Sequence, residues 1–163
     1  MTVARMYPLK TEVVRSPRRK KTVEARVVGD TLRVLLPASL SEEEEQHWVD
    51  EMRRRIERKT RSTHVDLSER ARSLARKYRL PEPAAISFTS RQQARWGSCS
   101  PESRSIRISS RLVEFPAWVL DYVIIHELAH LVETHHTRRF WNLVNRYTLT
   151  ERARGFLIAM EDR

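Results

Sequence analysis

The segment HELAHLVETHHTRRFW, residues 126–141, holds the residues best suited to chemistry, because it contains four of the chain's six histidines. His126 and His130 stand four positions apart, so on a helix they lie about 40° apart around the axis and project side by side. Two neutral imidazoles placed in this way can bind one Zn²⁺ at roughly 2.0–2.1 Å. Glu127 points about 100° away from His126 and can hold a water on the metal. The metal then lowers the pKa of that water and the carboxylate removes its proton.

The number of further ligands separates a catalytic zinc site from a structural one. A hydrolytic site uses three protein ligands and keeps one position open, whereas a structural site is closed by four. Cys99 is the chain's single cysteine, so a structural site has no pair of thiolates to use. The third ligand should follow the helix, where His135 and His136 are both candidates. His136 precedes Thr137, the predicted N-cap of the next helix, but spacing alone does not separate the two histidines.

A long buried helix must position these residues. The helix is predicted to begin at Pro116, because proline suits a first helical turn, and to run to about residue 134. Its sequence is apolar nearly all round, which indicates a buried helix, and ionisable groups there are costly unless they are paired or bound to metal. Two strands and two further helices should surround it, at 84–90, 103–110, 137–147 and 150–160. The strand segment 105–109 is predicted to be the one along which an extended peptide pairs.

The first part of the chain is predicted to be rich in β-strands. Residues 22–28 and 31–37 are β-branched and alternate, with a tight turn at Gly29. Ser41 should open a helix with Glu44 completing its capping box, and a second helix should begin near Asp66. We therefore expect one α+β domain over residues 1–163. Within it, residues 10–62 form basic strands plus a helix, and residues 63–163 form the catalytic portion.

The net charge of +10 is concentrated away from the histidines. Residues 1–80 carry 20 Lys and Arg against 12 Asp and Glu, whereas residues 81–163 carry 11 against 9. Two clusters, at 15–21 and 53–61, account for much of this excess. They could bind the phosphates of a nucleic acid, or they could be ordinary solvated faces. No aromatic residues interleave with either cluster, so base stacking has no evident platform.

The cellular setting is predicted from what the sequence does not contain. A single cysteine permits no intrachain disulfide, which fits a reducing compartment. The N-terminal residues lack the apolar stretch of a signal peptide, and no run of roughly 18 apolar residues could span a membrane. We therefore expect a cytoplasmic protein with no membrane partner.

Several of these features together resemble one known family. The segment Arg95–Cys99, HELAH at 126–130, His136 and the pair Phe140-Trp141 are similar to the pattern of the YgjP-like metallopeptidases. These are small zincins with relatives among the SprT-like proteases. The resemblance implies a zincin-like fold with a buried HExxH helix, a small antiparallel or mixed sheet, a Zn²⁺ cofactor and a peptide or protein substrate. It also implies His126, His130 and His136 as metal ligands and Glu127 as the general base.

Other residues near the motif have two interpretations each. Arg95 could stabilise an oxyanion or form a structural ion pair, and Cys99 could be a fourth ligand, a redox switch or a small buried group. Glu133 could orient a ligand, and Trp141 could line the cleft. His135 stands where the family usually has asparagine, and it remains the alternative third ligand or a group that stabilises charge in the transition state.

The predicted activity is zinc-assisted hydrolysis of a peptide bond. Two alternatives remain: hydrolysis of a phosphoanhydride in a nucleotide at the same metal, and a nucleic-acid-associated protein whose zinc site is stabilising or vestigial. The presence of Glu127 argues against the second alternative, because a structural site has no need of a base.

Overall fold

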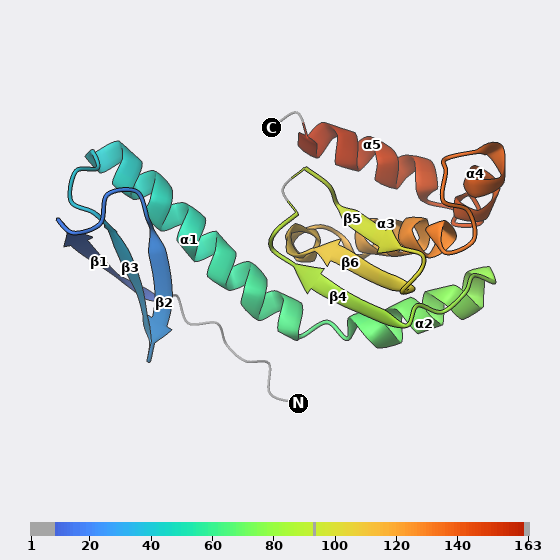
Figure 1. The fold of residues 1–163 in the computed structure, drawn as a ribbon, viewed down its shortest axis with the longest axis horizontal. Coiled ribbons are helices and arrows are strands. Elements are labelled where there is room, and N and C mark those ends of the chain that lie inside the picture. The colour runs from blue at the N-terminus through green and yellow to red at the C-terminus, as the bar shows by residue number, and fades with distance from the viewer. Residues whose placement is uncertain (1–8, 93, 162–163) are drawn as a thin grey trace. The chain divides into compact units, whose positions relative to one another are not determined.

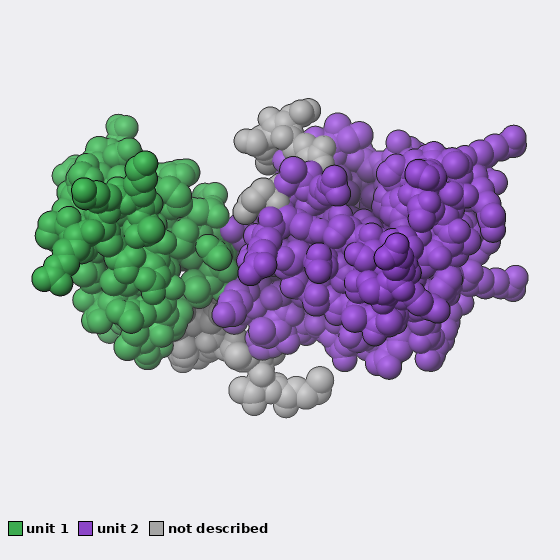
Figure 2. Space-filling view, viewed as in Figure 1, with its two compact units in different colours: residues 1–57 green, residues 58–163 purple. Residues whose placement is uncertain are grey.

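The computed structural model describes residues 9–92 and 94–161. The chain divides into two compact units, residues 1–57 and 58–163, which Figure 2 distinguishes by colour. The expected single-domain organisation stays a prediction. Among the described residues, no helix combines the length and the apolar character needed to cross a membrane.

The first unit contains a three-stranded mixed sheet with the order β1-β3-β2 (Figure 1). The strands are β1 (Lys10–Ser16), β2 (Glu24–Val28) and β3 (Thr31–Pro37), with β1 parallel and β2 antiparallel to β3. The predicted hairpin turn is confirmed, since Gly29 has a φ of 62°. Alternate residues of β3 are buried and form a small core with α1 (Glu42–Thr63), namely Leu32, Val34, Leu36, Val49 and Met52.

The start of α1 confirms the predicted capping box. The Ser41 hydroxyl accepts a hydrogen bond from the Glu44 N–H at 3.2 Å, and the Glu44 carboxylate accepts one from the Ser41 N–H at 2.8 Å. Two backbone N–H groups that a helix start leaves without partners are satisfied in this way. Glu44 in the acidic first turn of α1 therefore serves to cap the helix.

The second unit contains the long buried helix and a second mixed sheet. Its strands are β4 (Ala85–Thr89), β5 (Gly97–Ser100) and β6 (Ser105–Ser109), in the order β4-β6-β5. Because β6 pairs with β4 on one side and β5 on the other, the prediction that residues 105–109 receive a peptide is wrong. The remaining elements are a 3₁₀ turn, η1 (Ser110–Glu114), and four helices: α2 (Leu67–Tyr78), α3 (Ala117–His130), α4 (Arg138–Val144) and α5 (Thr150–Glu161).

Helix α3 is the centre of the second unit. It contacts the sheet, α2, α4 and α5 (Figure 1), and nine of its 14 residues are buried. The helix ends at His130, earlier than the predicted residue 134. The N–H groups of Leu131 and Val132 bond to the carbonyls of Leu128 and Ala129, three residues back, so the last turn tightens and the chain leaves the axis. The apolar pattern continues past His130, which is why it indicated a longer helix.

Candidate active site

Three histidines come together at the C-terminal end of α3. His126 and His130 lie one turn apart on the helix, with their ring centroids 5.0 Å apart. His136, from the loop before α4, brings its Nε2 to 3.1 Å from the Nε2 of His126. One potential ligand atom from each of the three residues lies within 4.8 Å of the other two. These atoms are close enough together for small shifts to place all three on one metal ion.

Hydrogen bonds on the far side of two rings orient the imidazoles. The Nδ1 of His130 lies 3.1 Å from the backbone oxygen of Glu133, and the hydroxyl of Tyr122 lies 3.5 Å from the Nδ1 of His126. When Nδ1 of His130 donates its proton to that carbonyl, the lone pair of Nε2 is left to face a metal. Glu133 thus contacts His130 through its backbone carbonyl, while its carboxylate accepts a hydrogen bond from the backbone N–H of His135.

Aromatic residues of α4 support the third histidine. Phe140 is fully buried, and its ring centroid lies 4.8, 4.4 and 4.7 Å from those of His126, His130 and His136. Trp141 stacks on His136 with centroids 5.7 Å apart and planes inclined by 27°. The loop is also anchored at its end, because the Thr137 hydroxyl caps α4 by accepting the Phe140 N–H at 3.3 Å. Trp141 is therefore a support for His136 and does not line the pocket.

The two candidate third ligands differ in position. His136 belongs to the group of three closely spaced histidines, and His135 does not. Both histidines are exposed and lie in the segment between α3 and α4, so the position of the ring and not its exposure separates them. The structure thus brings together the three histidines that the family resemblance implied, although their function as metal ligands stays a prediction.

The protonation of the histidines suits cation binding. Burial, and after it the neighbouring His130, His136 and Arg154, lower the pKa of His126 to about 3. Burial also lowers the pKa of His130, against the opposing effect of its hydrogen bond to Glu133. Both rings are therefore neutral near neutral pH, which is the form that binds a metal. Three clustered imidazoles are a donor set that fits a divalent transition metal such as zinc.

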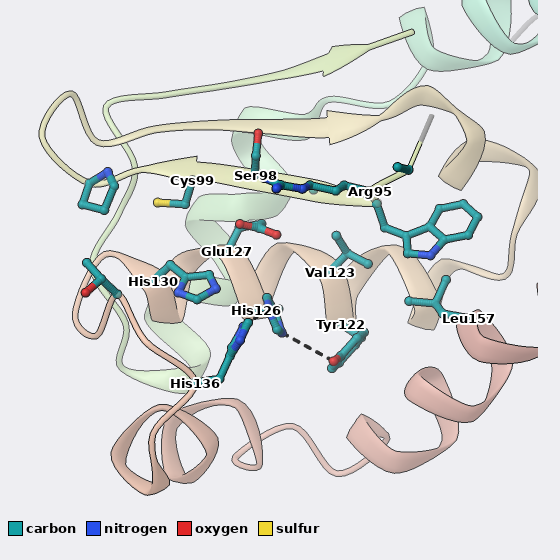
Figure 3. A pocket seen from close by; sticks show the side chains of 15 residues that line it. Arg95, Ser98, Cys99, Tyr122, Val123, His126, Glu127, His130, His136 and Leu157 are labelled. Carbon is teal, nitrogen blue, oxygen red and sulfur yellow. Dashed lines mark hydrogen bonds between the residues drawn. The ribbon is translucent and has the colours of Figure 1, made fainter. Parts of the chain in front are cut away.

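Glu127 lies beneath strand β5, and it is only 6% exposed. Burial raises the pKa of its carboxyl to about 8, and the nearby Arg95 guanidinium opposes that rise. A carboxylate with a raised pKa is suited to accept and then release a proton near neutral pH. Figure 3 shows the Glu127 side chain between β5 and the histidines.

Gly97 gives Glu127 the space that it occupies. A Cβ added at residue 97 would lie 2.6 Å from Oε1 and 2.9 Å from Cγ of Glu127. Gly97 is the first residue of β5. A glycine inside a strand often marks a close approach of another group, and that signal could have identified this contact.

The histidines and Glu127 face one pocket with a volume of about 700 Å³. The segment from Ala94 to Cys99 forms one wall, and residues of α3, of the segment between α3 and α4, and of α5 form much of the rest (Figure 3). Cys99 lines the pocket but is not among the clustered potential ligands. Burial and the charge of Glu127 raise the pKa of its thiol to about 11, which disfavours the thiolate that a ligand or redox switch would need.

The two basic clusters contribute no residue to this pocket. In the first cluster, Arg15 pairs with Glu45 and Arg19 pairs with Glu24. The exposed cations that remain there are Arg18, Lys20 and Lys21.

Comparisons with known proteins show what the chain is similar to. A family model described as YgjP-like, metallopeptidase domain, matches residues 38–152. Among solved structures, the metallopeptidase zymogen of Methanocaldococcus jannaschii jannalysin has a similar fold, with a TM-score of 0.51 and 20% sequence identity. That similarity covers 59% of this chain and 97% of jannalysin. No curated protein matches the chain.

Proposed function

Because the chain belongs to the YgjP-like family of metallopeptidase domains, we propose that it is a zinc-dependent peptidase whose general base is Glu127. The observation that carries this proposal is one shared pocket. It contains three histidines with ligand atoms within 4.8 Å of one another, together with the buried carboxyl of Glu127. We assign His126, His130 and His136 as the zinc ligands.

The proposed mechanism divides the chemistry between the metal and the chain. Zinc bound by the three imidazoles would polarise the peptide carbonyl and acidify the attacking water. Glu127 accepts the proton of that water and later gives it to the leaving amine. Its burial keeps bulk water from competing for the proton, and Gly97 keeps the carboxylate beneath β5. Arg95 favours the charged form of Glu127, so it helps to keep the base ready.

The edge of β5 supports a peptide as the substrate. The Trp96 carbonyl accepts a hydrogen bond from the Ser109 N–H at 2.8 Å, and Gly97 stands opposite Ile108 in the register. Bonded and non-bonded pairs alternate along an antiparallel ladder. The backbone groups of Gly97 and Cys99 must therefore point away from β6, and among the described residues β5 pairs with β6 alone. An extended peptide can add to this edge, whereas a nucleotide has no comparable backbone to pair with it.

Metal analysis and an activity screen test the proposed function. We expect the purified protein to hold about one zinc ion per chain and to cleave a casein-like protein. Glu127→Gln should keep the zinc, because glutamine retains the shape of the side chain, and should lose activity by about 10²–10⁴-fold. Glu102→Gln, an exposed glutamate in the turn between β5 and β6, is the matched control and should remain active.

Three results would count against the proposal. Zinc that is absent even after loading would remove the metal site. Loss of zinc in Glu127→Gln would make that residue a ligand. Hydrolysis of nucleoside triphosphates in place of proteins would mean that the same site cleaves phosphoanhydride bonds and not peptide bonds.

A further inference from the structure

The three clustered histidines are not held in the same way. The Nδ1 atoms of His126 and His130 face the Tyr122 hydroxyl and the Glu133 carbonyl, at 3.5 and 3.1 Å. Among the residues that the structure describes, His136 has a hydrogen-bond contact only through its Nε2, which faces His126. His136 is also exposed. The orientation of its ring therefore depends on the aromatic side chains that contact it.

Trp141 is the aromatic residue that fixes the plane of the His136 ring. The two rings are stacked at an angle of 27°, whereas Phe140 meets His136 edge-on at 76°. A stacked neighbour resists tilting of the ring, because tilting opens the contact between the two faces. Trp141 is itself only partly buried and belongs to the short helix α4. Its indole thus needs support of its own to hold His136 in place.

Arg154, from helix α5, supplies this support. Its guanidinium carbon lies over the Trp141 ring, 4.6 Å from the centroid. One nitrogen of the same guanidinium donates to both carboxylate oxygens of Glu151, one turn earlier, at 2.9 and 3.2 Å. The Glu151 side chain is 75% exposed, so this ion pair by itself contributes little to stability. A planar guanidinium is attracted to the face of an indole, and this contact holds the two groups together.

We infer that Arg154 is a positioning residue for the third metal ligand and that it acts on His136 through Trp141. This inference rests on the zinc-ligand assignment made for the proposed function. Arg154 does not line the pocket, so it acts without touching the substrate. Helix α5 packs on α3, which carries the other two histidines (Figure 1). The contact from Arg154 to Trp141 therefore ties an exposed ligand in a loop to the packed helices of the second unit.

The charge and the stacking of Arg154 affect a bound cation in opposite directions. A positive charge near Zn²⁺ repels it, so removal of the charge alone should tighten zinc binding. Loss of the stacked guanidinium frees the Trp141 ring, which lets His136 turn away from the other two histidines and should weaken zinc binding. The direction of the change therefore separates a positioning residue from a cation that only forms a surface ion pair.

Chelator competition on the full chain measures the zinc affinity. Arg154→Ala should weaken zinc binding by about threefold to tenfold. Arg152→Ala is the matched control, because the Arg152 guanidinium lies on the same helix and 4.7 Å from the centroid of Trp118. Trp118 packs on Phe156, and neither ring lines the pocket, so this variant should bind zinc as the native chain does. Unchanged or tighter binding in Arg154→Ala, or an equal loss in Arg152→Ala, overturns the inference.

A double-mutant cycle tests whether Arg154 acts through Trp141. In a chain that already carries Trp141→Leu, Arg154→Ala should weaken zinc binding no further, because only the effect of the charge remains. Arg154→Lys keeps the charge but not the planar group, so it should restore only part of the affinity. Urea unfolding of the metal-free variants shows whether each is folded. The same loss of affinity with and without the Trp141 ring would mean that Arg154 does not act through it.

None of these measurements depends on hydrolysis, so the positioning role and the peptidase function can fail separately. Zinc binding that depends on Arg154 as expected, in a chain that cleaves no protein, would support the positioning role and overturn the peptidase function. Cleavage of a protein by a chain whose zinc affinity does not change in Arg154→Ala would do the reverse. A native chain that holds no zinc even after loading would overturn both.

Discussion

Replacing Glu127 with glutamine should change how the stability of the metal-free protein depends on pH. Burial raises the pKa of this carboxyl from 4.5 to about 8. Between those values the folded chain holds a proton that the unfolded chain has released. Because the folded state then binds more protons, its stability falls as pH rises through this window. Glutamine does not titrate, so the stability of Glu127→Gln should not fall in this way as pH rises.

The size of the effect follows from the pKa. Each pKa unit corresponds to about 1.4 kcal/mol, so a rise from 4.5 to about 8 costs the native fold on the order of 4 kcal/mol by pH 8. Glu127 is 6% exposed, so little of this value is lost to screening by solvent. The pKa of His126 is lowered from 6.5 to about 3, so the contribution of His126 to folding stability is lost as pH falls below 6.5. Both proteins share that contribution, and it largely cancels in their difference.

Urea unfolding of the chelator-treated proteins measures this difference. The advantage of Glu127→Gln over the native chain should be small near pH 5 and should grow by a few kcal/mol towards pH 8. Glu102→Gln should show no such growth, since residue 102 is exposed. An advantage that stays constant across the range would refute the reasoning, because it would mean that the Glu127 carboxyl is not desolvated by β5.

Three further outcomes are expected. His136→Ala should weaken zinc binding by about 10²-fold or more in a chelator competition, while His135→Ala should leave it nearly intact; the reverse result would make His135 the ligand. Gly97→Ala should retain zinc but lower kcat/KM by about 10²-fold or more, because the new Cβ displaces the Glu127 carboxylate. Charge reversal across residues 18–21 should leave peptide hydrolysis unchanged and should remove most of any salt-sensitive DNA binding in a titration between about 50 and 200 mM salt. Full DNA affinity in that variant would place the contact elsewhere.

Features that depend on neighbouring residues were predictable from the sequence. The spacing of His126 and His130 fixes their separation on any α-helix, and an apolar sequence on all sides requires that helix to be buried. The capping box at Ser41 and the turn at Gly29 are likewise local, because each satisfies its own hydrogen bonds or dihedral angles within a few residues. The family resemblance is also confirmed, since the motifs that carry it stand in the sequence itself.

The completed site depends on contacts between distant segments. His136, rather than His135, lies with the other two histidines, where the tight exit from α3, the Thr137 cap and the Phe140 and Trp141 rings hold it. In the sheet, β5 is an edge strand and β6, residues 105–109, is the central strand. This order could not be predicted from the sequence, because the composition of a strand does not determine which strands pair with it. The contact between Gly97 and Glu127 joins residues 30 positions apart in the sequence, and burial beneath β5 raises the pKa of the carboxyl. The sequence determined which residue types could do the chemistry, and tertiary packing decided which of them meet and how strongly each is desolvated.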